Sequence, residues 1–197
     1  MKKLFQIACI LFGLLITQTL SARGDREAIR QSFCRVGLLS AQVLQSEGIS
    51  GSFLSADVLD DSRLVTPSGF LMSFQAGMSH RGWVRDYGSL QTSNLLGAIR
   101  PGWSIRFGEK VRLDAMAGVY VSYDLWGTQQ DEYGYSIPLR RVDGFNRFEF
   151  GVNAGLSFVV WKFEIYTELR QGTTNIYKLS DFKETSFVWC FGVGWSF

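Results

Sequence analysis

The sequence predicts an all-β protein: an antiparallel up-and-down transmembrane β-barrel of about eight strands that follows a cleaved signal peptide. Three observations carry this prediction. A short apolar run follows two lysines at the N-terminus. Segments of about ten residues then alternate in polarity down to the last residue, as membrane-spanning barrel strands do. No later stretch approaches the roughly 20 apolar residues of a membrane helix, so spanning strands would have to close into a barrel.

The N-terminus has the organisation of a signal peptide over 1–22. Two lysines precede the apolar run 4–16, and a pair of small residues ends the segment. The run is shorter than the roughly 20 residues that cross a bilayer, so a permanent anchor helix is the weaker alternative. Cys9 lies inside the run rather than after it, so no lipid anchor is indicated. We expect a short N-terminal segment over 23–32 and a barrel domain over 33–197.

The composition of the mature chain excludes several classes of protein. The sequence has 20 basic and 18 acidic residues, and the signal peptide removes two lysines, so the mature chain is near neutral. Because nucleic-acid binding usually needs a basic face and the arginines here are scattered, we expect no nucleic-acid partner. The two remaining cysteines, Cys34 and Cys190, are too few and too far apart for a disulfide scaffold or a metal site. They either form one bridge in an oxidising periplasm or stay as two buried thiols.

The clearest alternation lies at the C-terminal end of the chain. It predicts strands over 147–158, 163–170 and 187–197, the last of them aromatic on one face and mostly small on the other. The strand 163–170 places three charged side chains on one face, because successive side chains of a strand point to opposite sides. The terminal residue Phe197 resembles the end signal of chains that are delivered to the outer-membrane assembly machinery. We therefore expect this machinery to be a partner.

Three further strands precede these. The segments 70–79, 95–107 and 111–125 alternate in the same way, and 111–125 does so most cleanly. Pro101 removes a ladder hydrogen bond from the second of them, so a bulge or weak pairing is expected there.

The first two strands have the weakest alternation of polarity. We place them at 33–43 and 49–59, because an even strand number closes the barrel with both termini on one side. Both segments alternate poorly. A helix over 27–45 is a real competitor, since that stretch has few Gly or Pro breaks and is rich in Leu, Gln and Ala.

The connections give an independent test, because outer-membrane barrels alternate short periplasmic turns with longer external loops. The turns 108–110 and 160–162 are short, whereas the links 82–90, 126–146 and 177–185 are longer and more polar. The link 60–69 is long where a short turn is required, which counts against the model. Aromatic girdles are then expected near one rim, at Trp161, Trp195 and Phe197, and near the other, at Trp83, Tyr87, Trp126 and Tyr177.

A soluble lipocalin-like barrel or β-sandwich is the main alternative, because alternation also describes a sheet with one buried face. The apolar set here is too aromatic and continuous to be left in water, which favours a membrane. The opposite set would face the lumen as a polar network, and its charged members are Arg100, Arg106, Arg112, Asp114, Glu149, Glu164, Glu168 and Arg170.

From position 69 onward the chain resembles the PorT-like outer-membrane β-barrel proteins of Bacteroidetes. The resemblance is carried by the segments 147–156, 163–170, 172–176 and 191–197, which hold Gly-rich, acidic and aromatic strand patterns. The part before position 69 departs from the family, whose first strand is usually richer in Gly. The resemblance implies an outer-membrane barrel, often labelled porin-like, in a Gram-negative bacterium, and it implies no site residues.

A barrel of about eight strands encloses only side chains, so an open diffusion pore is not expected. The lumen charges would form a salt-bridged core, with a narrow ion pathway as the alternative. Function would then lie in the external loops, above all in 127–145. Its segment 131–135 and the pair Arg140-Arg141 could bind an envelope protein, a glycan or a lipid head group, or the loop is simply solvated.

An enzyme is not expected. The single histidine, His80, follows Ser79, and neighbours in a strand point to opposite faces, so the two cannot form a nucleophile and base pair. A lipid-acting enzyme that uses a more distant serine stays an alternative. The sequence holds no phosphate loop, dinucleotide fingerprint, metal-spaced cluster or nucleophile elbow, and it predicts no cofactor or metal site.

Overall fold

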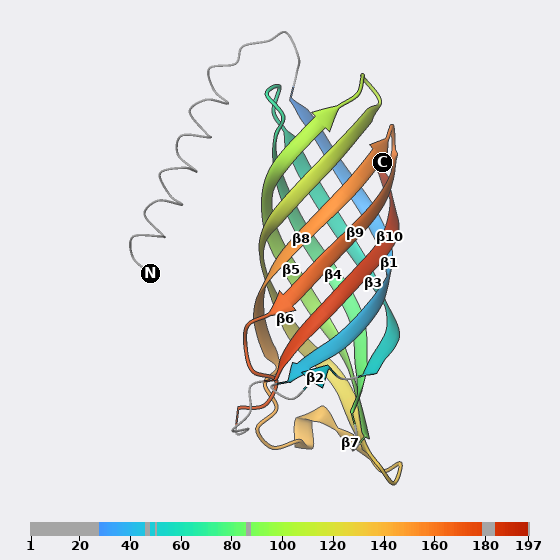
Figure 1. The fold of residues 1–197 in the computed structure, drawn as a ribbon, viewed down its shortest axis with the longest axis vertical. Coiled ribbons are helices and arrows are strands. Elements are labelled where there is room, and N and C mark those ends of the chain that lie inside the picture. Colours follow the sequence, from blue (N-terminus) through green and yellow to red (C-terminus); the bar gives the residue numbers. More distant parts are fainter. Residues whose placement is uncertain (1–27, 46–47, 50, 86–87, 179–183, 197) are drawn as a thin grey trace, which may run out of the picture.

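The computed structural model describes residues 28–45, 48–49, 51–85, 88–178 and 184–196. The predicted signal peptide and Phe197 lie outside these residues. Eight long strands dominate (Figure 1), and they are β1 (Ile29–Gln45), β3 (Gly51–Val65), β4 (Phe70–Arg85), β5 (Gly88–Arg106), β6 (Val111–Asp131), β8 (Phe148–Val160), β9 (Phe163–Gly172) and β10 (Thr185–Ser196). The shorter elements are β2 (Gly48–Ile49), β7 (Ser136–Pro138) and the 3₁₀ helix η1 (Leu139–Arg141).

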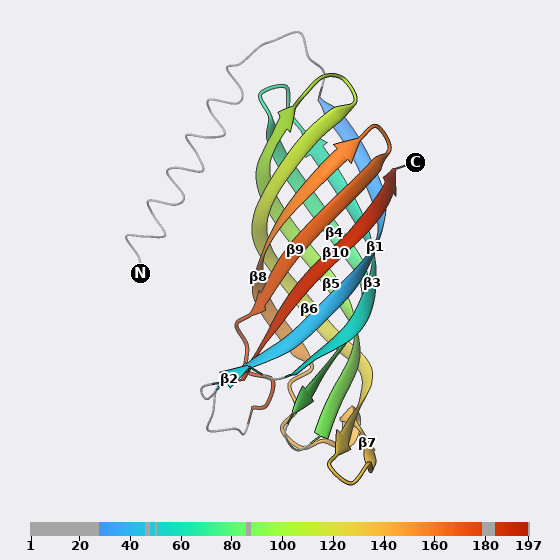
Figure 2. The ribbon, with the colours of Figure 1, turned by 45° about the vertical axis from the view of Figure 1, so that its right-hand side comes forward.

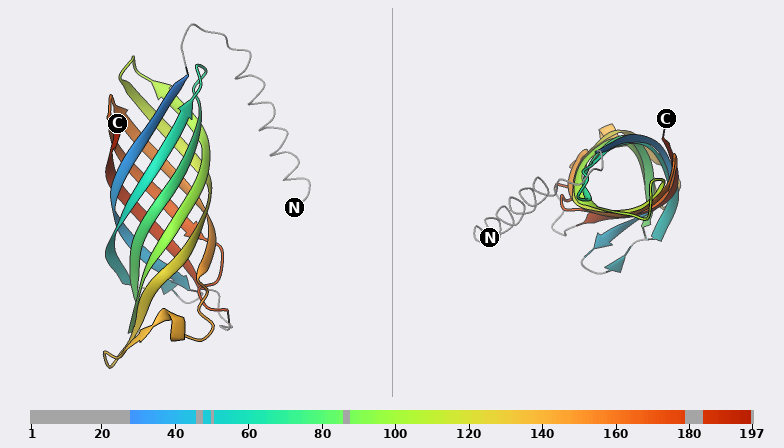
Figure 3. Two further views of the ribbon diagram at one scale, coloured as in Figure 1. Left: turned by 180° about the vertical axis from the view of Figure 1, so that it is seen from behind. Right: turned by 90° about the horizontal axis from the view of Figure 1, so that it is seen from above.

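The eight long strands close into a barrel. Each pairs antiparallel with the next along the chain, in the order β1-β3-β4-β5-β6-β8-β9-β10, and β10 pairs with β1 from Phe33↔Ser196 to Leu44↔Thr185. The view along the long axis shows the resulting ring (Figure 3). Closure leaves no unpaired sheet edge among these strands, which a membrane-spanning sheet requires. The predicted eight-stranded antiparallel barrel is confirmed.

The stretch Ile29–Gln45 is a strand, so the helical alternative is wrong for these residues. β1 begins four residues before the expected start and pairs with β3 on one side and with β10 on the other. Its side chains alternate strictly between buried and exposed from Phe33 to Leu39. Two flanking strands and a two-sided environment outweigh the helical propensity of Leu, Gln and Ala here.

The short connections lie at the end of the barrel that holds Ile29 and Ser196, as Figures 1 and 2 show. They are 66–69, 107–110 and 161–162. The link expected over 60–69 is shorter than predicted, because β3 continues to Val65. Gly69 adopts a φ of +98°, a backbone conformation that favours glycine, within the remaining four-residue turn. The connection between β3 and β4 is therefore short, as the prediction requires at this end of the barrel.

The other end of the barrel carries the longer structures. β4 extends to Arg85 and β5 begins at Gly88, so most of the predicted link 82–90 is a two-stranded ribbon. β6 runs on to Asp131 and pairs with β7, forming a hairpin that projects beyond the barrel (Figure 2). No helix among the described residues is long and apolar enough to cross a membrane.

The two faces of the sheet differ sharply in chemistry. Most side chains that point outward are apolar, with polar exceptions concentrated on β1 and β3, and those that point inward are largely polar or charged. The outward apolar band is formed by Val36, Leu38, Leu54, Val58, Phe74, Met78, Leu95, Ile99, Ile105, Val119, Val121, Phe150, Val152, Phe158, Ile165, Leu169, Phe191 and Val193.

The aromatic rims follow the prediction only in part. Near the chain termini, Trp161 and Trp195 are exposed, and Trp195 packs edge-on against Phe163 with ring centroids 4.0 Å apart. At the other end, Trp126 is exposed as predicted. The prediction for Trp83 is wrong, because this side chain faces the lumen and is 1% exposed. The physical reason is that β4 carries its alternation on through Trp83, which puts the odd-numbered position inside.

Candidate functional site

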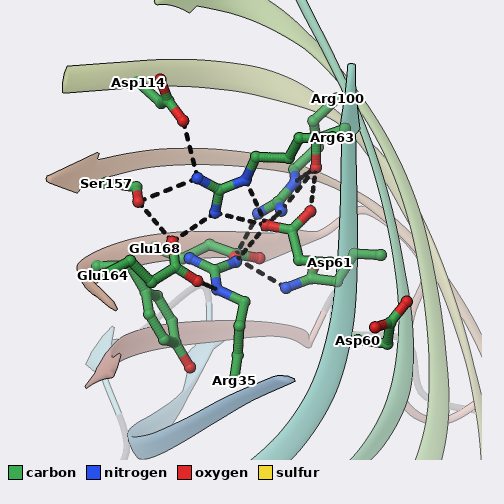
Figure 4. A network of polar contacts seen from close by, with 12 residues as sticks. Arg35, Asp60, Asp61, Arg63, Arg100, Asp114, Ser157, Glu164 and Glu168 are labelled. Carbon is green, nitrogen blue, oxygen red and sulfur yellow. Dashed lines mark hydrogen bonds and ion pairs between the residues drawn. The ribbon is translucent and has the colours of Figure 1, made fainter. Parts of the chain in front are cut away.

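The lumen near the chain termini is filled by a charged cluster centred on Asp61 of β3. Its carboxylate accepts hydrogen bonds from Arg63 Nη2 at 2.7 Å and Arg100 Nη2 at 2.8 Å, and Arg35 Nη1 lies 3.1 Å away as an ion pair. The four side chains come from β1, β3 and β5 and are at most 3% exposed (Figure 4). Three guanidinium groups therefore share one carboxylate that has no access to water.

Two glutamates of β9 complete the cluster from the opposite wall. Glu164 accepts from Arg63 Nη2 at 2.6 Å and lies 2.8 Å from Arg35 Nε, while Glu168 accepts from Arg100 Nη1 at 2.6 Å. Because β3 and β9 are not neighbours in the sheet, these bonds cross the lumen. The interior at this level is bridged by ion pairs rather than open.

The same network extends further along the lumen in both directions. Arg170 bonds Glu168 and Asp57, each at 2.8 Å. Toward the chain termini, Asp114 accepts from Arg63 at 2.8 Å and from Arg112 at 3.1 Å. We call these ten side chains the lumen network, and its members are Arg35, Asp57, Asp61, Arg63, Arg100, Arg112, Asp114, Glu164, Glu168 and Arg170. Positive and negative groups are equal in number, as buried charges require.

A second, smaller cluster lies nearer the long loops. Arg81 Nη1 donates to Glu149 Oε1 at 2.8 Å and lies 3.5 Å from Asp124. Glu149 also accepts from the hydroxyl groups of Tyr120 and Ser186, each at 2.7 Å. The half of the lumen near the long loops thus begins with polar groups, and each carboxylate is paired with Arg81.

The mouth beyond this cluster is closed by apolar side chains, which we call the cap. Leu139 of η1 and Ile176 of the β9–β10 loop pack into the barrel against Trp83, Leu90 and Val188. The two loops are joined by backbone hydrogen bonds, Asn146 N to Ile176 O at 2.8 Å and Lys178 N to Gly144 O at 2.7 Å. The cavity below the cap measures about 10 Å³, about the volume that one water molecule needs.

The eight charged residues predicted for the lumen fall into three places. Six of them belong to the lumen network and Glu149 belongs to the second cluster. Arg106 is only partly buried at the rim near the termini, where it donates to the carbonyl oxygens of Val65 and Thr66 at 3.4 and 2.9 Å. These bonds cap the turn between β3 and β4.

Sequence reasoning missed six charged lumen residues, namely Arg35, Asp57, Asp61, Arg63, Arg81 and Asp124, as members of this set. Four of them lie on β1 and β3, where the predicted strands ended at 43 and 59 and alternation looked poor. The available signal was the run of odd-numbered positions Asp57, Asp61 and Arg63, interrupted only by the apolar Leu59. The outward Asp60 obscured it by placing two acidic residues side by side.

His80 lies on the outer face of β4, and Ser79 is buried in the lumen, so the two point to opposite sides. His80 Nδ1 is 2.9 Å from the hydroxyl oxygen of Ser93 on β5. Ser93 is 8% exposed, and among the described residues no carboxylate contacts His80. Cys34 and Cys190 are free thiols on opposite faces, one exposed and one buried. Within the described part of the chain, no group of three or more potential ligands is arranged to hold a metal ion.

No protein-family model and no curated protein matches the sequence. Solved structures do match the fold. Neisserial surface protein A has a TM-score of 0.52 at 10% identity, and the match covers 84% of this chain and 97% of that one. This similarity shows the fold alone.

Two further structures match below a TM-score of 0.5. Ail of Yersinia pestis, in complex with the heparin analogue sucrose octasulfate, has a TM-score of 0.48 at 14% identity over 87% of this chain and 100% of that one. The outer membrane protein OprG of Pseudomonas aeruginosa has a TM-score of 0.47 at 9% identity over 87% and 96%.

Proposed function

We propose that the protein is a closed, non-enzymatic barrel of the Gram-negative outer membrane that presents a rigid external hairpin to a protein partner. The observation that carries the proposal is the contrast between the wall of the barrel, its lumen and the β6–β7 hairpin. The wall is apolar outside, the lumen is filled with paired charges and a cap, and the β6–β7 hairpin stands clear of both.

The membrane location is supported by the distribution of polarity. A soluble barrel buries apolar side chains inside and leaves polar ones in water. Here the described strands do the reverse, with exposed Phe, Trp, Leu and Val side chains surrounding a charged interior. Such a surface is suited to contact with lipid, because an apolar band of this extent is not left in water.

The β6–β7 hairpin has a tip of fixed shape. Asp131 Oδ1 accepts hydrogen bonds from the backbone N–H groups of Tyr133 at 3.0 Å and Tyr135 at 2.8 Å, and Gly134 adopts a φ of +87°. The turn presents two tyrosine rings that are 78% and 72% exposed. Tyrosine supplies contact area with few rotatable bonds, so a pre-formed pair of rings loses little entropy on binding.

A protein partner suits this tip and its surroundings. The neighbouring η1 exposes Arg140 and Arg141, and Tyr and Arg are the residue types enriched at the centres of protein interfaces. A glycan would use the same rings, and the experiment below separates the two.

The experiment that tests this function places a photo-crosslinking amino acid at position 133 in intact cells and identifies the adducts by mass spectrometry. We expect one defined protein adduct that disappears when Tyr135→Ser is added, because both rings contribute. The same crosslinker at position 178, on the β9–β10 loop, is the matched control. Adducts that are glycans, or a pattern that is the same at both positions, would contradict the proposal.

The location is tested separately by refolding the protein in detergent and comparing its gel mobility before and after boiling. A folded membrane barrel shifts on heating and has a β-rich circular dichroism spectrum. A protein that is soluble without detergent would contradict the membrane location and revive the lipocalin-like alternative.

The narrower assignments are part of the same proposal. The patterns on β8, on β9 and over 191–197 support membership of the PorT-like family of Bacteroidetes. The outward aromatic residues of β10, Trp189, Phe191 and Trp195, support recognition by the outer-membrane assembly machinery. Deletion of Phe197 is expected to slow membrane insertion in cells, and unchanged insertion would count against that role.

A further inference from the structure

The apolar band is interrupted on one side of the barrel by polar outward side chains of β1 and β3. These are Ser32 and Cys34 on β1 and Asp60 and Ser62 on β3. They form a compact patch, because Ser32 is the cross-strand partner of Ser62, and Cys34 is the partner of Asp60. In the described part of the long strands, no other outward position within the band carries a carboxylate.

Asp60 lies deep in the band rather than at its edge. It precedes the end of β3 at Val65 by five residues, which is roughly 12 Å along the axis of a barrel with strands tilted at about 45°, or about half of a ~25 Å apolar band. Exposed Val58 and Leu64 flank it along the strand, and exposed Phe74 lies on the neighbouring β4. The carboxylate therefore faces the region that hydrocarbon chains would occupy.

Within the chain, Asp60 is only partly satisfied. The Ser62 hydroxyl donates to its Oδ2 at 3.2 Å, and no described cation pairs with the carboxylate. Figure 4 shows Asp60 on the outer side of β3, away from the lumen network that surrounds its neighbour Asp61. The contrast with Thr167 is informative, because that outward hydroxyl bonds the carbonyl oxygen of Cys190 at 3.1 Å and accepts from the Trp189 ring N–H at 2.8 Å. A carboxylate that faces lipid is unfavourable unless something covers it.

We propose that this patch is a self-association surface at which a second copy of the chain docks within the membrane. The proposal rests on the membrane location proposed above. In a two-fold dimer, each copy uses the same surface, so β1 of one copy meets β3 of the other. The hydroxyl and thiol donors of Ser32 and Cys34 then face the carboxylate of Asp60 in the second copy, and this match occurs twice. The patch is therefore complementary to itself.

The shape of the surface allows close approach. A hollow adjoins the patch, and its lining includes two residues of the patch, Ser32 and Ser62, together with Arg30, Leu64 and Phe74. Small and hydroxyl-bearing residues are those that let membrane segments pack closely and hydrogen-bond across an interface. The side chains of the second copy can therefore approach Ser62, whose hydroxyl group bonds Asp60.

The test uses the mature chain, from position 23 onward, reconstituted in phospholipid vesicles; it lacks Cys9, so Cys34 is the exposed thiol and Cys190 is buried. A short bis-maleimide is expected to link two copies through Cys34, and sedimentation in density-matched detergent is expected to give a dimer. Asp60→Leu, which makes the band continuous, should reduce dimer formation by roughly tenfold or more, because it removes two symmetric polar contacts. Asp60→Asn, which can still accept a hydrogen bond, should give an intermediate value.

The matched control moves the thiol to the far side of the barrel by combining Cys34→Ser with Val152→Cys on β8, and it should give no linked dimer. A monomeric wild-type protein, an Asp60→Leu variant that dimerises as well as wild type, or equal linking through position 152 would overturn the proposal. Heat-dependent gel mobility is measured on the same samples. A protein that shifts on heating yet stays monomeric overturns the interface alone, whereas one that never enters vesicles overturns the membrane location.

Discussion

The two halves of the barrel interior are filled by opposite means. The half near the chain termini holds the lumen network, ten charged side chains contributed by the strands themselves. The half near the long loops ends in the cap, where Leu139 and Ile176 enter the lumen from loops. The network ties non-adjacent strands together across the lumen, whereas the cap ties loops to strands. The first should therefore govern stability of the whole barrel and the second the local order of the loops.

The largest effect is expected from Asp61→Asn. The substitution keeps the size of the side chain but leaves Arg35, Arg63 and Arg100 without their shared carboxylate, and breaking a buried ion pair on one side costs about 3–5 kcal/mol. The free energy of unfolding in lipid vesicles, followed by urea titration, should fall by that amount. Asp60→Asn is the matched control, since it changes the adjacent residue on the opposite face.

At protein dilutions where the chain is monomeric, Asp60→Asn should change the free energy of unfolding by less than about 1 kcal/mol. Equal losses of unfolding free energy from Asp61→Asn and Asp60→Asn would contradict the stabilising role of the lumen network, because only Asp61 belongs to it.

A smaller, local effect is expected from Leu139→Ala. Removing a buried leucine costs about 2–3 kcal/mol, and because η1 lies in a loop, this cost falls on opening of the cap, giving roughly 30- to 100-fold faster proteolysis of the β6–β8 loop. The free energy of global unfolding should change little. Ile137→Ala, at an exposed position of β7, is the control and should leave the cleavage rate as in wild type. Global unfolding that follows Leu139→Ala would contradict the division between network and cap.

Arg106→Ala should have a modest effect. Its guanidinium group bonds two carbonyl oxygens at the rim, where it is only partly buried, so the free energy of unfolding should fall by only about 1 kcal/mol. Urea titration measures this loss. A loss as large as that of Asp61→Asn would show that Arg106 stabilises the barrel as much as the lumen network does.

The smallest effect is expected from His80→Ala. His80 bonds Ser93, but no described carboxylate orients the imidazole as a catalytic base would require. Lipid and peptide hydrolysis by the purified protein should be the same in the variant and in wild type. Hydrolysis that is present in wild type and disappears in the variant would establish the lipid-acting alternative.

The strands could be predicted from the sequence because period-two alternation survives wherever outward positions are uniformly apolar, as in β6 and β8. It weakened in β1 and β3 because Asp60, Ser62 and Ser32 face outward and remove the contrast between the two faces. The same patch that blurred the pattern is the one that we propose as an interface.

The sequence predicts which kinds of side chain fill the lumen, but not which of them bond to one another. Alternation indicates that Glu164 and Arg100 point inward, but closure and register decide that each bonds a partner on a distant strand. The cap could not be predicted at all, because Leu139 and Ile176 lie in loops that have no periodicity. Their burial depends on the bonds between the two loops near Asn146 and Ile176.

The most direct test of the closed lumen is the current through planar lipid bilayers that contain the folded protein, with insertion verified by heat-dependent gel mobility. Because the lumen network bridges opposite walls and the cap fills the mouth near the long loops, we expect no discrete conductance steps above the bare bilayer. Reproducible steps from the wild-type protein would contradict the account, and would show that the ion pairs around Asp61 line a pathway instead of closing it.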